Sequence, residues 1–139
     1  MNFHIRFARP ADYDWCRGID EHVSDELLQW KLDRKEIVLA EADNKAVGYV
    51  RLEFICSKAP YLGFIHVDAL FRRRGAGRSM LAFLEHELRD RGHSFLLSSS
   101  QQNEPEPQAW HQHMGFRTCG SLSEINEDGS DEVFFRKLL

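Results

Sequence analysis

The chain has 139 residues, a length that fits one domain with a sizeable core. Hydrophobic residues make up 42% and charged residues 29%, a globular composition that excludes an intrinsically disordered chain. The formal net charge of −4 argues against general nucleic-acid binding, because such domains are usually basic.

The cysteines and the distribution of apolar residues indicate in which cellular compartment the protein is expected. The three cysteines have no CxxC spacing, which predicts reduced thiols and neither a disulfide framework nor a zinc site. The N-terminus lacks the apolar run of a signal peptide, and no stretch approaches the length of a membrane span. We therefore expect a cytoplasmic protein with no membrane partner.

The first residues are expected to form one strand and two short helices. The segment 3–8 alternates apolar and polar residues, which predicts a strand, and Asp12 is a suitable helix cap. From 14 to 32 the apolar spacing is helical but broken, which predicts two helices, the second starting at Ser24 or Asp25.

A hairpin and a βαβ unit are expected in the middle of the chain. Strand-like runs at 37–42 and 46–56 flank an Asp-Asn-Lys turn. The apolar run 62–67 leads through a short loop into a helical pattern that stops at Gly92, and a buried-type strand follows at 95–98. This order predicts two parallel strands with a right-handed crossover.

The last third predicts a short helix and an antiparallel pair of strands. Pro105 and Pro107 suit a loop and first helical turn before a helix over Ala109–Met114. Strands are expected at 116–125 and 132–138. The complete order, βααβββαβαββ, predicts a mixed α/β fold with helices on both sheet faces.

The loop after the run 62–67 carries the first motif. A strand, a Gly/Arg turn and a helix start present free backbone N–H groups and a positive dipole end to an anion. Arginines add full charges that can pair with phosphate. We therefore expect a phosphate-bearing ligand, the alternative being a solvated arginine run. The residues are Arg72, Arg73, Arg74, Gly75, Ala76, Gly77, Arg78 and Ser79.

Two familiar phosphate motifs do not fit this loop. A Walker loop aligned on Gly77 needs a first glycine where Arg72 stands. A dinucleotide fingerprint fits Gly75 and Gly77 but fails at Met80.

The sequence Arg72-x-x-Gly75-x-Gly77, placed after Val67-Asp68, resembles the acyl-CoA-binding motif of the GNAT N-acetyltransferase superfamily. The family's second motif, an Asn followed by a helix ending in Gly-Phe, is similar to Asn103 and the segment Trp110–Phe116 here. The element order is also similar across nearly the whole chain.

The resemblance implies a single N-acetyltransferase domain over residues 3–139. Its fold would be a mixed, mostly antiparallel sheet with one parallel βαβ unit and helices on both faces. Its activity would be the transfer of an acetyl group from acetyl-CoA to a primary amine of a small molecule or a protein. The amine would attack directly in a ternary complex, with no metal.

The resemblance also assigns cofactor-binding residues. The backbone of Val67, Asp68 and Ala69 would pair with the pantetheine arm, and the loop Arg72–Ser79 would take the pyrophosphate. Asn103 would contact the pantetheine or organise the helix that follows it.

The catalytic residues are less well defined by the resemblance. The family's usual acid is a Tyr four residues before Gly-Phe, and this chain has His111 there. His111 is thus a candidate acid, the alternative being a polar residue without proton duty. Relatives often carry the base as a carboxylate on the strand before Asn103, but this chain has none there. Glu53 and His66 therefore remain as candidate bases. The alternative for each is an ordinary sheet residue with a satisfied side chain. A metal held by His111 and His113 is excluded, because i and i+2 side chains diverge on a helix.

Three questions about partners and activity stay open. The acidic segment 12–26 is either a rim that attracts a cationic acceptor or a solvated face. The missing Tyr and carboxylate allow a second hypothesis, a CoA-binding sensor or regulatory module without transfer activity. Binding of RNA or DNA through the arginines is disfavoured by the acidic net charge, and a homodimer is suggested only by analogy with relatives.

Overall fold

The structure is a computed structural model that describes residues 1–139 and contains two compact units. Unit 1 consists of Met1–Glu53 and Gly63–Glu87, and unit 2 consists of Phe54–Leu62 and Leu88–Leu139. None of the helices combines the length and apolar character that a membrane crossing requires.

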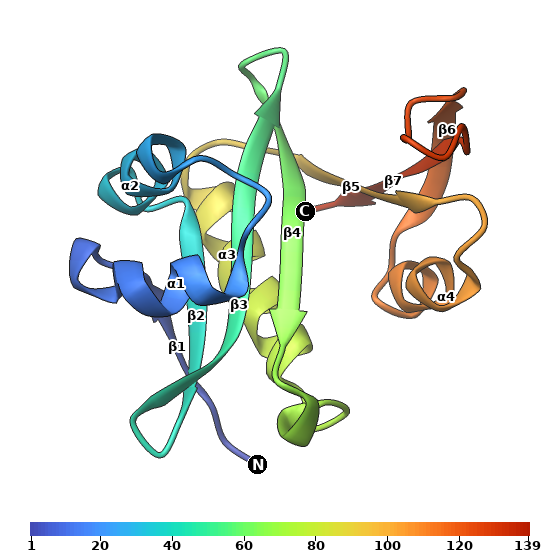
Figure 1. The fold of residues 1–139 in the computed structure, drawn as a ribbon. Helices are drawn as coiled ribbons and strands as arrows, with labels where there is room; N and C mark the ends of the chain where they lie inside the picture. The colour runs from blue at the N-terminus through green and yellow to red at the C-terminus, as the bar shows by residue number, and fades with distance from the viewer. The chain divides into compact units, whose positions relative to one another are not determined.

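The elements follow the predicted order, with two 3-10 turns added (Figure 1). The strands are β1 (His4–Phe7), β2 (Ile37–Ala42), β3 (Lys45–Ile55), β4 (Ala59–Val67), β5 (Phe95–Gln101), β6 (Arg117–Leu122) and β7 (Glu132–Leu138). The helices are η1 (Pro10–Asp12), α1 (Tyr13–Ile19), α2 (Asp25–Asp33), η2 (Ala69–Phe71), α3 (Ala76–Asp90) and α4 (Pro105–His113).

The strands pair in the order β1-β2-β3-β4-β5-β7-β6. The pairs β1–β2, β2–β3, β5–β7 and β6–β7 are antiparallel. β4 and β5 are parallel, with Tyr61 opposite Leu97, as the βαβ pattern predicts. The predicted fold class, a mostly antiparallel mixed sheet with one parallel pair, is therefore confirmed.

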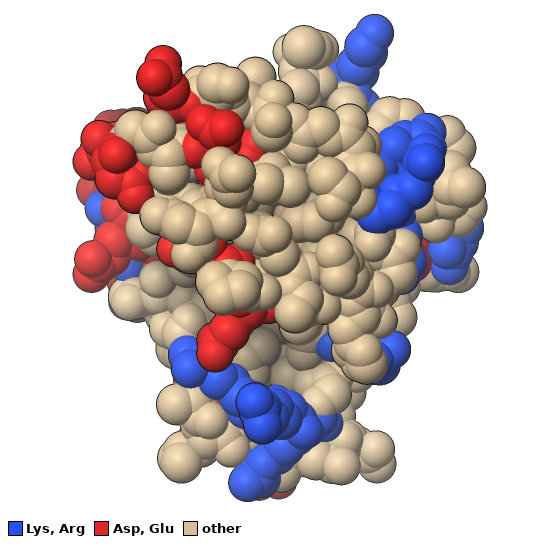
Figure 2. All heavy atoms as spheres, turned by 90° about the vertical axis from the view of Figure 1, so that its right-hand side faces the viewer, with Lys and Arg blue, Asp and Glu red and all other residues tan.

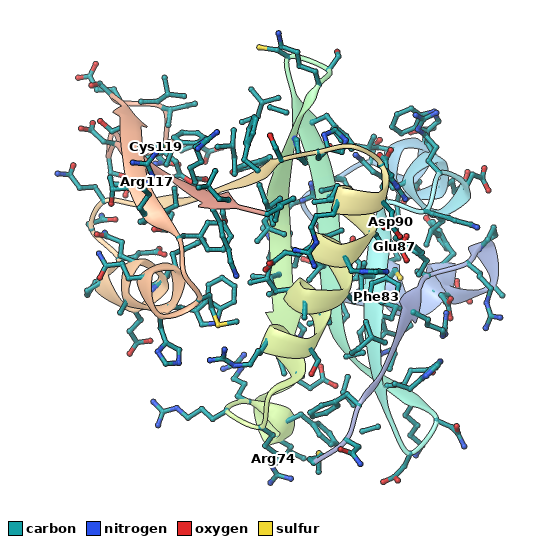
Figure 3. The ribbon with its side chains drawn as sticks, turned by 180° about the vertical axis from the view of Figure 1, so that it is seen from behind. Arg74, Phe83, Glu87, Asp90, Arg117 and Cys119 are labelled. Carbon is teal, nitrogen blue, oxygen red and sulfur yellow. The ribbon has the colours of Figure 1, made fainter.

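Unit 1 is a layered structure in which helices cover both faces of its strands. Figures 1 and 3 show α1 and α2 on one face and α3 on the other. α3 buries Met80, Leu81 and Leu84, whose spacing places them on one side of the helix. The contact is close at Gly48, where an added Cβ would lie 2.9 Å from Met80 Cε. On the other face the core contains Leu28, Leu32, Ile37, Leu39 and Tyr49.

Unit 2 is built around β5, β7 and β6, with α4 before β6 (Figure 1). Alternate β5 residues are buried, namely Leu96, Ser98 and Ser100. Phe135 of β7, opposite Ser98, is also buried. The period-2 pattern thus turns one face of β5 inward, as expected for a strand.

Several predicted boundaries were wrong for local reasons. α4 begins at Pro105 and not at Ala109, because a proline fits the first helical turn, where its missing N–H is not needed. Asp12 does not cap α1 through its side chain; its carboxylate instead accepts hydrogen bonds from Arg6 and the Arg9 N–H. Ser24 does cap α2, accepting from the Leu27 N–H at 3.2 Å.

Candidate active site

The loop between β4 and α3 exposes three consecutive arginines in unit 1. Arg72, Arg73 and Arg74 are all exposed, and Figure 2 shows basic side chains gathered at the foot of the molecule. In Figure 3, Arg74 lies below the first turn of α3, and its guanidinium is 6.0 Å from the Phe71 ring. Like charges held this close favour an anionic ligand that would relieve their repulsion.

The backbone of this loop turns sharply into the helix. Arg73 and Gly75 have φ values of 62° and 95°, the left-handed region in which glycine is unstrained. The helix begins with a 2.9 Å hydrogen bond from the Ser79 N–H to the Gly75 carbonyl. The N–H groups of Ala76 and Gly77 precede that bond and lack a partner within the helix. Backbone donors, dipole and arginines together fit a pyrophosphate.

The segment Val67–Ala69, predicted to pair with pantetheine, is partly engaged within the chain. The Val67 carbonyl accepts from Arg72 Nε at 3.0 Å. The Asp68 N–H donates to the Val47 carbonyl at 2.8 Å. A pantetheine amide would therefore use the carbonyl's second lone pair or displace the Arg72 side chain.

His66 and Asp68 form a pair at the end of β4. His66 Nε2 lies 3.2 Å from Asp68 Oδ1, and both side chains are part-exposed, at 29% and 38%. A carboxylate beside an imidazole fixes the ring's orientation, which is the arrangement of a general base and its orienting partner. The sequence had assigned Asp68 only a backbone role, so its side chain is an addition to the site.

Glu53, the other candidate base, is held by two cations. Its Oε1 accepts from Lys31 Nζ at 2.7 Å, and its Oε2 accepts from Arg51. An added Cβ at Gly63 of β4 would meet Glu53 Cγ at 2.7 Å, so the aliphatic part of the Glu53 side chain lies directly over that glycine. With 28% of its side chain exposed, Glu53 can contact a ligand, but both oxygens are already engaged.

Behind Glu53 lies a buried network of alternating charges, which we call the charge network. Lys31 Nζ also bonds Glu36 at 2.8 Å and the Leu52 carbonyl at 2.7 Å. Arg51 Nε bonds Asp20 at 2.7 Å. The members are Asp20, Lys31, Glu36, Arg51 and Glu53.

Asp20 anchors one end of the charge network and has no exposed surface. Its carboxylate accepts from the Tyr49 hydroxyl at 2.6 Å, from Arg51, and from the His22 N–H at 3.1 Å. Burial opposes its ionisation, but the hydrogen bonds from Tyr49 and Arg51 outweigh burial and lower the pKa of Asp20. The loop between α1 and α2 is therefore fastened to β3.

The acidic segment 12–26 is less available to a cationic acceptor than its composition suggests. Asp12 pairs with Arg6, Asp20 pairs with Arg51, and Asp25 pairs with Arg17 at 3.0 Å. Glu21, by contrast, is exposed and forms no ion pair. Three of the six carboxylates in this segment thus form ion pairs within the chain.

His111 is buried in unit 2 and both of its ring nitrogens are occupied. Nδ1 donates to the Pro107 carbonyl at 2.7 Å, so in the neutral ring Nε2 accepts from the Ser98 hydroxyl at 2.6 Å. The ring stacks on Phe135, with centroids 4.4 Å apart. Burial lowers the pKa of His111, which disfavours the protonated form that an acid needs.

Unit 2 also holds a hydrogen-bonded row that the sequence did not predict. The Tyr61 hydroxyl lies 2.6 Å from Ser99 Oγ, which donates to Glu132 of β7. A carboxylate therefore does reach β5, although the β5 sequence itself contains none. Asn103 hydrogen-bonds to Asp128 and, with Ser130, lowers the pKa of that carboxyl, Ser130 having the larger effect.

Comparison with known proteins identifies the family. The sequence model of the Acetyltransferase (GNAT) family matches residues 6–116, so the chain belongs to this family. A search of curated protein sequences gave no match.

Solved structures share the fold over the whole chain. Ribosomal-protein-alanine N-acetyltransferase from Brucella melitensis is 25% identical, with a TM-score of 0.80 over 98% of this chain and 99% of that one. Ard1 from Thermoplasma volcanium is 15% identical, with a TM-score of 0.84 and coverages of 100% and 99%. The NatC complex bound to Gag peptide and CoA is 11% identical, with a TM-score of 0.81 and coverages of 100% and 99%.

The charge network predicts a large cost for removing its buried anchor. Asp20→Asn keeps the shape but removes the fully buried one of the two carboxylates that pair with Arg51, Glu53 remaining as the other, so the free energy of unfolding should fall by about 1.5–3 kcal/mol. Urea denaturation measures this change. Asp14→Asn, at an exposed position of α1, is the control and should change stability by less than ~0.5 kcal/mol. A loss below ~1 kcal/mol for Asp20→Asn would contradict the role given to Asp20.

The burial of His111 predicts a pH-dependent stability. Because its pKa is lower in the folded chain, the unfolded chain takes up the proton first, and stability falls as the pH drops below about 6.5. His111→Gln should flatten the dependence of unfolding free energy on pH between about 7.5 and 5.5. His4→Gln, at an exposed site, should leave it unchanged, and equal slopes in all three proteins would refute this account of His111.

Proposed function

We propose that this chain is an acetyl-CoA-dependent N-acyltransferase that moves an acetyl group to a primary amine by direct attack in a ternary complex. The observation that carries the proposal is the start of α3, where unpaired helical N–H groups follow three exposed arginines. Membership of the GNAT family supports acyl-CoA as the anion that this loop accepts.

In the proposed site the chain's own residues position the donor. Acetyl-CoA supplies the thioester when bound. The loop Arg72–Ser79 holds its pyrophosphate, and the backbone of Val67–Ala69 aligns the pantetheine arm. Asn103 is proposed to organise the start of α4. It lies two residues before Pro105, the first residue of that helix, and its side chain hydrogen-bonds to Asp128.

We propose that His66 accepts the proton of the attacking amine. A lysine-like amine has a pKa near ~10.4 and must be deprotonated before it attacks, so a base accelerates the reaction. His66 contacts Asp68 through Nε2, which leaves its other ring nitrogen, Nδ1, to accept a proton. Both oxygens of Glu53, by contrast, accept hydrogen bonds from cations. Glu53 is the second candidate base and would accept the proton through a bridging water.

The leaving thiolate needs less help than the amine. A thiol has a pKa of about 8.5, so the CoA sulfur leaves readily near neutral pH. His111 would act as the acid only in its protonated form, which burial disfavours. We therefore assign His111 a smaller contribution to the rate than His66.

For the acceptor, we propose the amine of a protein or peptide as the first class to test. The basis is the likeness to a ribosomal-protein-alanine N-acetyltransferase over nearly the full length of both chains. A peptide that begins with alanine and a panel of small primary amines would separate the two acceptor classes.

A second candidate function is CoA binding without transfer, as in a sensor or regulatory subunit. The engaged nitrogens of His111 and the paired oxygens of Glu53 favour it. The two functions differ in turnover: both bind CoA, but only the enzyme releases free CoA thiol with an amine present.

A thermal melt with acetyl-CoA tests binding at the loop. At ~100 times the dissociation constant, the ligand should add about 2.7 kcal/mol to the unfolding free energy. Gly77→Glu places a negative charge at the phosphate position and should abolish the shift. Ala82→Glu, at an exposed position further along α3, is the control and should retain it. No shift of the native chain at about 1 mM acetyl-CoA would overturn both candidate functions.

Thiol release with the alanine peptide tests the base. His66→Gln should lower kcat by about 10²-fold or more, because the attacking amine loses its proton acceptor. Asp68→Asn leaves the ring without its orienting carboxylate and should give a smaller loss. His4→Gln is the control, and an unchanged kcat in His66→Gln would exclude His66 as the base.

A further inference from the structure

Three polar side chains of unit 2 form a hydrogen-bonded row on the face of the sheet that α4 does not cover. Ser98 faces His111 of α4, so its neighbour Ser99 lies on the opposite face, where it is part-exposed. Ser99 hydrogen-bonds both to the Tyr61 hydroxyl of β4, at 2.6 Å, and to the Glu132 carboxylate of β7. Strands from three parts of the chain thus meet at one serine.

The protons of this row all point toward the carboxylate. A serine hydroxyl has one proton, and Ser99 donates its proton to Glu132. The hydrogen bond between Tyr61 and Ser99 must therefore use the tyrosine proton, with the serine oxygen as acceptor. A phenol oxygen that donates its own proton can also accept one from a bound ligand. The row is thus arranged to pass a proton from Tyr61 to Glu132.

Glu132, at one end of the row, is held in place by neutral partners. One of its oxygens accepts from Ser99 and the other accepts from the Asn126 side-chain amide at 3.2 Å. No lysine, arginine or histidine forms an ion pair with it, so its negative charge is not compensated within the chain. The residue is part-exposed, so a proton that reaches it can pass on to water.

Tyr61, at the other end of the row, suits a positively charged nitrogen. Its ring lies beside that of Phe134 of β7, with the centroids 6.0 Å apart, and the residue is part-exposed. Aromatic faces attract a cationic nitrogen, and the uncompensated charge of Glu132 favours the same sign. An amine that docks here can donate an N–H to the phenol oxygen.

We infer that Tyr61 is a catalytic residue that receives a proton from the acceptor nitrogen, and that Ser99 and Glu132 are positioning residues that act through it. The inference rests on the proposed function. An ammonium group has three N–H bonds and the amide product has one, so the nitrogen loses two protons during the reaction. His66 takes the first of them before attack, and the row takes the second once the bond to carbon has formed.

The atoms and charges of this step balance. The nitrogen lone pair bonds to the thioester carbon, and the carbon–sulfur bond breaks with its electron pair leaving on sulfur as the thiolate. The nitrogen gives its proton to the Tyr61 oxygen, while the tyrosine proton moves to Ser99 and the serine proton moves to Glu132. A nitrogen bonded to a carbonyl carbon is a much stronger acid than an ammonium, so a carboxylate is a sufficient final acceptor. One negative charge thus passes from Glu132 to the CoA sulfur.

Steady-state kinetics of the full chain test the row one group at a time, with acetyl-CoA and the best acceptor among the alanine peptide and the amine panel. Tyr61→Phe, Ser99→Ala and Glu132→Gln should each lower kcat by about tenfold or more, because an intermediate that keeps its proton returns to amine and thioester. The KM for acetyl-CoA should stay within about twofold. Ser99→Thr retains the hydroxyl and should keep most of kcat. The double variant of Tyr61→Phe and Glu132→Gln should lose no more than the larger single loss, because the groups act as a unit.

The control is Ser121→Ala, at an exposed position of β6, which should match the native chain. A native kcat in Tyr61→Phe or in Glu132→Gln overturns the relay, and so does a loss in Ser99→Ala that Ser99→Thr shares. A lowered kcat that comes with a lost thermal shift by acetyl-CoA marks a structural effect and also overturns it. Turnover by the native chain with unaffected variants rejects the relay alone, whereas a native chain that acetylates none of these amines rejects the proposed function as well.

Discussion

The charge network is the constraint on which the first unit depends most. Ordinary sheet hydrogen bonds extend along β2 and β3 as far as Ile37 and Arg51. Beyond them the Leu52 carbonyl is satisfied by Lys31 of α2, and the Leu52 N–H donates to the Glu36 carbonyl. The Lys31 ammonium of α2 thus supplies the hydrogen bond that a neighbouring strand would otherwise give to β3. Because buried ions are costly unless fully paired, each member holds its neighbours in one arrangement.

The charge network holds in place the elements of unit 1 that carry its candidate functional groups. Asp20 fastens the α1–α2 loop to β3, and the His22 ring of that loop packs 5.0 Å from Phe64 of β4. Glu53 is fixed over Gly63, while His66 is oriented only by Asp68. The loop proposed to bind phosphate follows the C-terminal end of β4, whereas Glu53 lies over Gly63 in the middle of that strand, so the two can be altered by separate substitutions.

The fold was largely predictable because its signals are local. The alternation of apolar and polar residues predicts β1 and β3. The helix stop at Gly92 and the buried-type strand at 95–98 predict the βαβ unit. The start of α4 was missed because two prolines look like a loop although the first turn tolerates them.

The site was predictable only where it is contiguous. The loop Arg72–Ser79 has its glycines and arginines in one stretch, so the sequence alone is enough to propose that it binds an anion. The pairing of Asp20 with Arg51, 31 residues apart, and of Ser99 with Glu132, 33 residues apart, depends on the tertiary fold. The sequence left His111 as a candidate acid or a polar residue without proton duty, whereas its environment is set by Ser98 and Phe135, which are distant in sequence.

Recognition of the phosphates of an acyl-CoA by the start of α3 and its arginines is the proposal on which the function depends. Isothermal titration calorimetry with CoA and with pantetheine, which lacks the pyrophosphate and nucleotide, tests it most directly. We expect CoA to bind measurably, its affinity to fall as salt is raised because charges are screened, and pantetheine to bind at least about a hundredfold more weakly. Equal affinities for the two ligands would contradict it.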